Sequence, residues 1–533
     1  RCLSDWSSDV CSSDLALSCA AAFWTARRRG EADRPSPNSP LTSSALEVLS
    51  WKPNTPYNEV IPLLLVIVSA VFLTTFTGSM VNVVLPVIRA EFDASPALIG
   101  WVVTGYLLAY AVGVPILGRA SDRYGIRRLF AAGVAGFALG GVVCALAPSL
   151  PVLVLGRTLQ GLTGAAVPAL SAVAVAKSFP PGRRGGALGM IASTVGIGQS
   201  VGPIAGGVLN EWLSWRGLFG IPIALALALL PFLLRLLPDG RSDQVRRLDG
   251  AGGLLLALSA GLFLFSVTQG QQLGFGSVAS WGALLGAVLA SAALVWRSRR
   301  VPHPFVPLGL FRNRSYVTAL FAGPPAMFVN LAVLMLVPLL VVEVNGLSSG
   351  ATGMILTPHA VAMAIMSPFA GKLSDRLGVR RPVRLGLAAL LLTVAALSTW
   401  AGAAPGAVAV MMALVGAGLA CIQSPANNAA ANALPEEDVG AGMGLFQGMG
   451  FLMGAAGPAI AGALLAARQE AGVFAWNPLA GGLTAGTASG LAAAPFSDVF
   501  LSLLLPLAVA FLAAARLPAA AGPLQESRAP SKT

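Results

Sequence analysis

The chain contains fourteen stretches of about twenty mostly apolar residues, and this pattern limits its fold more than any other feature. One such stretch, coiled as an α-helix, crosses the ~30 Å hydrocarbon layer of a bilayer. Lipid offers no hydrogen bonds to the backbone, so a spanning segment of this kind must be helical. The sequence therefore predicts an all-α integral membrane protein. The runs begin near Val60, Ala97, Leu129, Val152, Ala187, Leu218, Ala251, Val278, Tyr316, Gly353, Val383, Ala407, Met443 and Phe496.

Composition and charge agree with a lipid environment. Charged residues make up 11% of the chain, against about 25% in soluble domains. This excludes a soluble enzyme, a disordered chain and a nucleic-acid binder. The net charge of +12 comes from short loops between the apolar runs. With a cytoplasmic N-terminus, all but four of the 34 Lys and Arg residues fall on the cytoplasmic side. We therefore expect a multi-pass protein of the cell membrane with both termini in the cytoplasm. The four exceptions are Arg89, Arg157, Arg216 and Arg468.

The apolar runs divide the chain into regions. Residues 57–238 and 301–517 each hold six runs, and the linker 239–300 holds two. Residues 518–533 form a predicted cytoplasmic tail. Residues 1–56 lack an initiator Met and contain a near-repeat of S-S-D, so we interpret them as a disordered leader or as sequence foreign to the native protein.

A loop after the second run of each half is repeated. G-R-A-S-D-R-Y-G-I-R-R at 118–128 recurs as G-K-L-S-D-R-L-G-V-R-R at 371–381. A carboxylate at this place can pair with basic groups or cap the N-terminus of a neighbouring helix. We interpret the two loops as a conformational latch, which closes in one state and opens in the other; the alternative is an ordinary basic loop. The proposed latch residues are Gly118, Asp122, Arg123, Gly125, Arg127, Asp375 and Arg376.

Two further motifs lie inside apolar runs. Arg157 and Gln160 are one turn apart in the fourth run, where an arginine costs about 2.5–3.5 kcal/mol on insertion scales and thus indicates a role; the alternative is an arginine that extends to the membrane surface. The fifth run carries glycines and a proline at spacings that favour close helix packing and a bend. These residues are Gly198, Gly202, Pro203, Gly206 and Gly207.

Together these motifs resemble the signatures of the major facilitator superfamily. The glycine–proline pattern, with fourteen predicted spans, is similar to that of its fourteen-helix drug:proton antiporters, including tetracycline and multidrug efflux members. The resemblance covers about residues 57–517. It implies two six-helix halves plus two linker helices, and export of drug-like amphiphiles by alternating access in exchange for protons. It implies no cofactor and no enzymatic activity, and a monomer is our expectation.

The sequence departs from that branch at its acidic positions. Thr77 and Gln199 stand where the branch or its tetracycline exporters carry an acid, as does Gly454. No Asp or Glu is expected in the middle of a span. The remaining candidate proton carriers are Glu211 and Glu343 near span ends, Asp122 in the loop, and His359, whose side chain titrates near neutral pH. Transport without proton coupling, by a facilitator or importer of a metabolite, is the alternative.

Polar side chains within the runs suggest a binding cavity with few polar groups in apolar walls, which suits neutral or anionic amphiphiles. Each amide could equally form an ordinary hydrogen bond between helices. The predicted cavity residues are Asn82, Tyr106, Gln199, Asn330, Gln423, Asn427 and Gln447. A membrane enzyme or receptor is disfavoured, because the sequence has no P-loop, no nucleophile elbow in a suitable setting and only two, widely separated histidines.

Overall fold

The computed structural model describes residues 57–179, 181–238, 249–347, 349–435, 438–471 and 488–517. Every regular element in these ranges is helical. Residues 57–533 form one compact unit. The predicted leader and tail lie outside the described residues, as does most of the loop that opens the linker, so those predictions stay untested.

The helices follow one another in three groups along the chain. The first group is α3 (Tyr57–Glu91), α4 (Pro96–Tyr124), α5 (Ile126–Ala145), α6 (Leu150–Gly164), α7 (Ala166–Ser178), α8 (Pro181–Leu218) and α9 (Gly220–Leu236). The linker holds α10 (Gly250–Leu273) and α11 (Val278–Ser298). The last group is η1 (Leu308–Arg312), α12 (Arg314–Ala322), α13 (Pro324–Glu343), α14 (Ser349–Leu377), α15 (Arg380–Thr399), α16 (Pro405–Asn432), α17 (Val439–Ala471), α19 (Ala488–Ser502) and α20 (Leu504–Ala514).

Twelve helices or helix pairs among the described residues are long and apolar enough to cross a membrane, or thirteen if one bent pair is counted as a span. That pair joins Trp212–Leu218 to α9 at an angle of 50°. The predicted run that begins near Ala187 lies in α8, which is 38 residues long but is not among the twelve. The all-helical membrane architecture is confirmed, whereas the count of fourteen spans is not.

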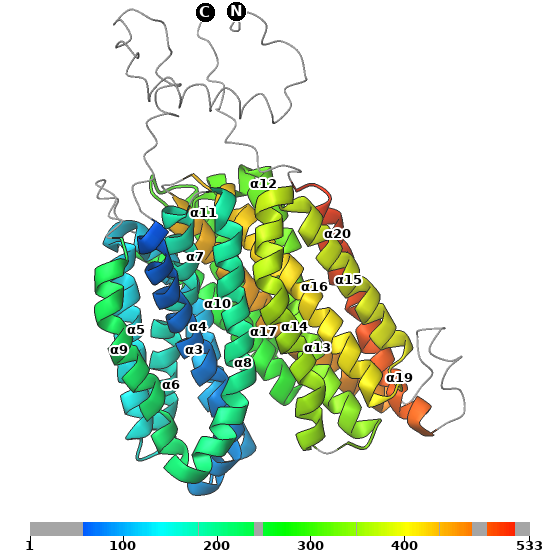
Figure 1. The fold of residues 1–533 in the computed structure, drawn as a ribbon. Helices are drawn as coiled ribbons and strands as arrows, with labels where there is room; N and C mark the ends of the chain where they lie inside the picture. The colour runs from blue at the N-terminus through cyan, green and yellow to red at the C-terminus, as the bar shows by residue number, and fades with distance from the viewer. Residues whose placement is uncertain are drawn as a thin grey trace, which may run out of the picture. The chain divides into compact units, whose positions relative to one another are not determined.

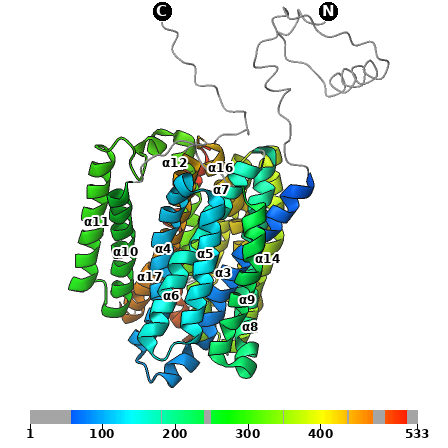
Figure 2. The same cartoon turned by 90° about the vertical axis from the view of Figure 1, so that its left-hand side faces the viewer.

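The two six-run halves stand side by side, with α3–α9 on one side of the bundle and α12–α20 on the other (Figure 1). Helix α8 packs against α3 in the first half, and α17 packs against α13 in the second, so the halves repeat the same arrangement. Between the halves, α8 packs against α14 and α4 against α17. The linker helices α10 and α11 lie beside this bundle (Figure 2).

Two of the breaks within spans occur at small residues, one of them beside prolines. Helices α12 and α13 meet at Gly323, which two prolines follow, and α6 and α7 meet at Ala165. A proline lacks the N–H that would continue the helical ladder, so such breaks need neighbouring helices around them. Helix α7 meets this need, because its residues 166–176 are all buried except the half-buried Pro168. It thus forms part of the interior of the first half.

Candidate functional site

The two repeated loops have the same local geometry. Ser121 donates a hydrogen bond to the carbonyl of the first glycine of its loop at 2.6 Å, and Ser374 does the same at 3.0 Å. Gly125 and Gly378 have φ values of 82° and 77°, a region that favours glycine and ends the preceding helix. The repeat in sequence is therefore a repeat in structure.

Asp122, at the end of α4, caps a helix of the opposite half. Its carboxylate accepts hydrogen bonds from the backbone N–H groups of Gly440 at 3.1 Å and Ala441 at 3.2 Å, in the first turn of α17. Arg119 donates to the same carboxylate at 3.1 Å. The first N–H groups of a helix have no partner within it and carry a partial positive charge. A carboxylate at this place accepts hydrogen bonds from these N–H groups, and its negative charge offsets their partial positive charge.

Asp375, at the end of α14, caps a helix of the first half in the same way. It accepts hydrogen bonds from the backbone N–H groups of Gly185 and Gly186, each at 2.9 Å, in the second turn of α8, near its N-terminus. Its third donor is the amide of Asn428 at 3.2 Å, in place of an arginine. Each half thus contributes one acid that binds a helix N-terminus of the other.

Glycines let the backbones of the two halves touch beside these acids. A Cβ atom on Gly118 would lie 2.6 Å from Cα of Gly444, and one on Gly371 would lie 2.0 Å from the carbonyl oxygen of Gly185. Real side chains do not reach such distances, so any larger residue would push the helices apart. We call this end of the bundle, where the repeated loops lie, the loop end; here the two halves are closed against each other.

Other hydrogen bonds between the halves lie toward the loop end as well. Arg184 donates to the side chain of Asn432 at 2.9 Å, and Ser424 donates to the carbonyl of Gly185 in α8 at 2.9 Å. Ser193, two turns further along α8, donates to the carbonyl of Ala364 at 2.6 Å. Toward the opposite end the halves spread apart (Figure 1).

The other predicted latch residues lie around the two acids without contacting them. Arg123 is exposed and stands 5.4 Å from the ring of Tyr124, and Arg376 is exposed. Arg127 donates to the carbonyl of Leu237, at the end of α9, at 2.6 Å. The arginine that does contact Asp122 is Arg119, which we did not predict. Its spacing of three residues on one helix was a usable signal.

Arg157 lies buried inside the first half. Its guanidinium donates to Gln160 at 2.9 Å and to the carbonyl of Val102 at 3.4 Å, and it stands 4.2 Å from the ring centre of Tyr106. The side chain is 1% exposed. Neutral oxygens and an aromatic face therefore surround this cation.

Aromatic rings connect Arg157 to the surface between the halves. Tyr106 stacks on Tyr110 with ring centres 5.5 Å apart, and Tyr110 meets Phe451 of α17 edge to face at 4.8 Å. Both separations suit favourable aromatic pairs. A movement of α17 relative to α4 would break the second pair and expose the first.

The glycines of the fifth run hold α8 against α3. Cβ atoms on Gly198, Gly202 and Gly206 would come within 2.2, 2.8 and 2.8 Å of atoms of α3. Gly207 has more room, with its nearest neighbour at 4.0 Å. Pro203 lies in α8, but its side chain is outside the described set. Close backbone packing at these glycines is what small residues provide in membrane helices.

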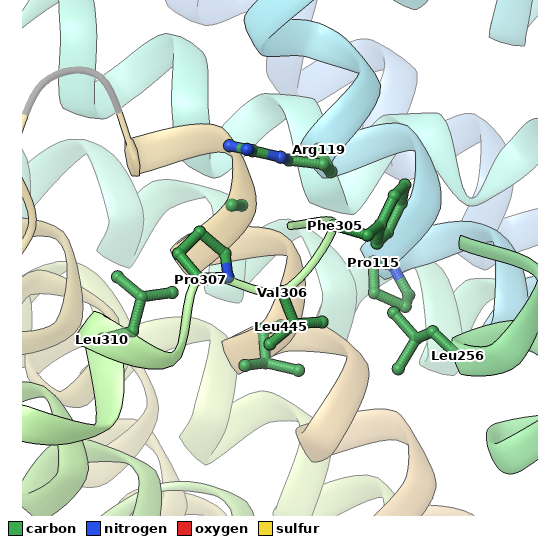
Figure 3. Close-up of a pocket in the computed structure, with 9 residues that line it drawn as sticks. Pro115, Arg119, Leu256, Phe305, Val306, Pro307, Leu310 and Leu445 are labelled. Atoms are coloured by element: carbon green, nitrogen blue, oxygen red, sulfur yellow. The ribbon is translucent and has the colours of Figure 1, made fainter. Parts of the chain in front are cut away.

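The predicted cavity residues differ in burial. Asn82 and Gln199 are exposed, Gln423 and Gln447 are half-buried, and Tyr106, Asn330 and Asn427 are buried. The side-chain oxygen of Asn427 is buried without a partner. A small pocket lies instead at the loop end, lined by Arg119, Pro115 and residues that follow α11 (Figure 3). None of the predicted cavity residues lines it.

The candidate proton carriers have different surroundings. His359 is buried in α14 and shares a hydrogen bond of 2.8 Å with Asn330 of α13. Glu343 is exposed and accepts from Gln469 at 3.0 Å. Glu211 lies in α8, and its side chain is outside the described set. Asp122, the fourth candidate, is engaged in the helix cap.

Asp498, close to the start of the last predicted run, is fully buried. Asp498 of α19 is 0% exposed and accepts from Arg468 of α17 at 2.8 Å. A buried carboxylate needs such a partner, because its charge loses the solvation of water. Burial of this pair depends on how α17 and α19 pack, which the sequence did not indicate.

At the opposite end, Trp215 and Arg216 of α8 form hydrogen bonds with two other segments of the first half. Both side chains donate to Glu91 at the end of α3, and Arg216 also donates to the carbonyl of Ala147 at 3.2 Å. Arg216 stands 4.3 Å from the ring of Trp215. These contacts join α3, α8 and the loop after α5 within one half.

Comparison with known proteins identifies this architecture. Residues 67–458 match the family model of the Major Facilitator Superfamily. The chain belongs to this superfamily. It is therefore a multi-pass membrane transporter of the kind that binds small-molecule substrates, and members of this family are generally not enzymes.

Several relatives are named for resistance or transport. The chain is 32% identical over 397 residues to the multidrug resistance protein Stp of Mycobacterium tuberculosis, with 74% of each chain covered. It is 30% identical over 446 residues to the tetracenomycin C resistance and export protein of Streptomyces glaucescens, covering 82% of this chain and 80% of that protein. It is 27% identical over 400 residues to the riboflavin transporter RibZ of Clostridioides difficile, covering 74% and 86%.

A solved structure shares the fold. The human organic anion transporter MFSD10 (TETRAN) superposes with a TM-score of 0.59 at 16% identity, covering 85% of this chain and all of that one. At this identity the likeness concerns the fold alone.

Proposed function

We propose that this protein exports amphiphilic, drug-like small molecules across the cytoplasmic membrane by alternating access, in exchange for protons. The likeness to resistance and export proteins over most of the chain carries the proposal. The capped loop end supports the alternating-access part, because it is a closed gate built from separable contacts.

We assign the loop end to the cytoplasmic side. The excess of Lys and Arg in loops supports this orientation, with both termini in the cytoplasm. The described conformation would then be closed to the cytoplasm. In that state the halves spread toward the outside (Figure 1).

Opening of the loop end would release both caps. Asp122 would leave the N-terminus of α17, and Asp375 would leave that of α8. Water can then solvate both the carboxylates and the freed N–H groups, so the closed and open states differ by a modest free energy. Such a balance is what a carrier needs to change state repeatedly.

The substrate class follows from the polar groups inside the bundle. Arg157 is a buried cation, and Tyr106 and Tyr110 present aromatic faces beside it. Asn82, Gln199, Gln423, Asn427 and Gln447 supply neutral polar groups on other helices. Apolar walls with few polar groups favour amphiphiles, and a cation without a nearby buried acid favours neutral or anionic ones.

Proton exchange would use one of the candidate carriers. His359 is our first choice because it is buried in α14 with one neutral partner, Asn330. A change of its charge there would strongly alter its interactions with its surroundings. Glu211, Glu343 and Asp122 are the other candidates. Replacing His359 with Gln keeps a hydrogen bond to Asn330 but removes the titration, so it should abolish proton movement and leave substrate binding.

The test uses everted membrane vesicles that carry the full chain. We expect neutral or anionic amphiphiles to accumulate inside the vesicles when the interior is acidic, and not in vesicles with the Asp122→Asn, Asp375→Asn double variant. Accumulation of cationic compounds alone would contradict the proposed substrate class. Accumulation of none from a broad panel would contradict export.

A facilitator or importer of a metabolite is the second candidate. Its support is the riboflavin transporter relative, together with the absence of an acid at the branch's usual positions Thr77, Gln199 and Gly454. The two functions differ in a gradient-free assay. A facilitator would equilibrate its substrate equally well without a pH gradient, whereas the antiporter requires one for accumulation.

A further inference from the structure

One of the two linker helices, α10, contacts both halves. Helix α10 packs against α4 and against α17. The segment 301–307, which we call the strap, leads from α11 to η1 (Figure 3). Phe305 and Val306 of the strap form an apolar cluster with Ile116 of α4 and Leu445 of α17. The contacts of the linker therefore depend on whether α4 and α17 pack against each other.

Arg119 joins the strap to the latch. Its guanidinium donates to Asp122 at 3.1 Å and lies 3.7 Å from the carboxylate of Asp438, just before α17. Its other terminal nitrogen donates to the backbone carbonyl of Pro304 in the strap at 3.3 Å. The residue is 7% exposed. One buried side chain therefore contacts the capping acid, the start of α17 and the linker.

The strap itself is held firmly on α10. Phe305 lies against Gly253, where a Cβ atom would come within 3.0 Å of its ring. Asp249 caps α10 by accepting from the backbone of Gly252 at 3.0 Å, and Arg297 of α11 donates to it at 2.7 Å. A displacement of α10 or α11 would therefore move the strap carbonyl that Arg119 uses.

Among the described residues, the second latch shows no such connection. The residue at the position of Arg119 in the repeat is Lys372, which is exposed. Asp375 receives its third hydrogen bond from Asn428 of the same half instead. In both latches an acid binds the backbone of a helix in the other half, but only the first latch contacts the strap. Lys372 is therefore a matched control for Arg119.

We propose that Arg119 is a positioning residue through which the linker helices stabilise the closed loop end. With the strap in place, Pro304 and Asp122 together fix the guanidinium, and the guanidinium orients the carboxylate toward α17. Loss of the strap contact leaves Arg119 less ordered and the cap weaker. The linker thereby sets the balance between closed and open states on one side of the bundle. This inference rests on the latch proposed above.

The test measures opening directly and needs no substrate. Spin labels at Tyr124 and Leu377, both exposed at the loop end on opposite halves, report the distance between α4 and α14. The full chain is used with its five native cysteines replaced. The variants are Arg119→Lys, which keeps the charge but not the forked geometry, and Phe305→Ala, which frees the strap without touching Asp122.

We expect each variant to lower the ratio of closed to open distances on the order of tenfold, the effect of losing one hydrogen bond to a charged group. The double variant should fall no further than the larger single effect, because both act on one contact. Lys372→Ala should leave the ratio within about twofold of the original. Thermal melting of each variant checks folding, and Val306→Ala repeats the strap test with a smaller change.

The outcomes separate this inference from the latch. If Asp122→Asn opens the loop end but the strap variants do not, the linker plays no part and the inference is wrong. If Arg119→Lys and Lys372→Ala shift the ratio equally, the shift does not depend on the contact with the strap and the inference is wrong. If Asp122→Asn itself leaves the distances unchanged, the latch proposal fails first.

Discussion

Replacing Asp122 with Asn preserves the size of the side chain but removes its charge and one of its two acceptor oxygens. In the closed state the carboxylate accepts from Gly440, Ala441 and Arg119. An asparagine oxygen can accept from only part of this set, and its NH2 group would face another donor. The variant should therefore destabilise the closed loop end relative to the open one.

The size of the effect follows from these contacts. Hydrogen bonds to a charged group contribute about 1.5–3 kcal/mol each, and about two would be lost. Water replaces part of these two bonds in the open state and the side chain is 15% exposed, so we expect less than their summed contribution, about 2–3 kcal/mol. At tenfold per 1.4 kcal/mol, the ratio of closed to open molecules falls about 30- to 150-fold.

The assay is the same pair of spin labels at Tyr124 and Leu377 in the reconstituted full chain. Asp375→Asn should act in the same direction, because its carboxylate also caps a helix. The two caps lie on different helix pairs, so their free energies should add in the double variant. An Asp122→Asn protein that is folded, inserted and still closed would refute the capping argument, whatever its transport activity.

Three other perturbations give sharp expectations. Arg157→Ala should abolish transport while the protein still inserts, because Gln160 and Tyr106 lose their shared partner; transport that survives would favour an arginine without a role. Gly371→Ala should prevent closure of the loop end, seen as a longer label distance, because its Cβ would lie 2.0 Å from a carbonyl of α8. Burial raises the pKa of Asp249, but hydrogen bonds from Arg297 and the backbone of α10 outweigh it and leave the pKa below its ordinary value. Its stabilisation is thus present above the unfolded pKa of about 3.9 and is lost as pH falls through the folded value. The difference in melting temperature between the original protein and Asp249→Asn should shrink below about pH 4, and a difference independent of pH would contradict this.

Local patterns in the sequence predicted much of the fold. The apolar runs located the helices, and the repeated loop indicated that Asp122 and Asp375 lie at equivalent places. In the structure these two acids accept hydrogen bonds from the backbone of α17 and α8. These features depend on residues close together in the chain. The predicted count of fourteen spans is not confirmed, because α8 is long but is not among the twelve described helices that are apolar enough to cross a membrane.

Contacts between distant segments could not be predicted in the same way. Gly440 lies 318 residues after Asp122, and no local pattern in either segment names the other. The burial of Asp498 depends on the packing of α19 against α17. The contact of Arg119 with Asp122 was not predicted. Its position one turn before Asp122 on the same helix is nevertheless a local signal for such a pair. The predicted cavity residues were chosen by polarity alone, which does not indicate the direction of a side chain.

The most direct test of the proposed export mechanism is proton release from everted vesicles that carry the full chain. With the vesicle interior acidic, addition of a neutral or anionic amphiphile should cause protons to leave the interior, and His359→Gln should stop this release. Transport of the compound without any movement of protons would contradict the antiport mechanism and favour a facilitator on the same fold.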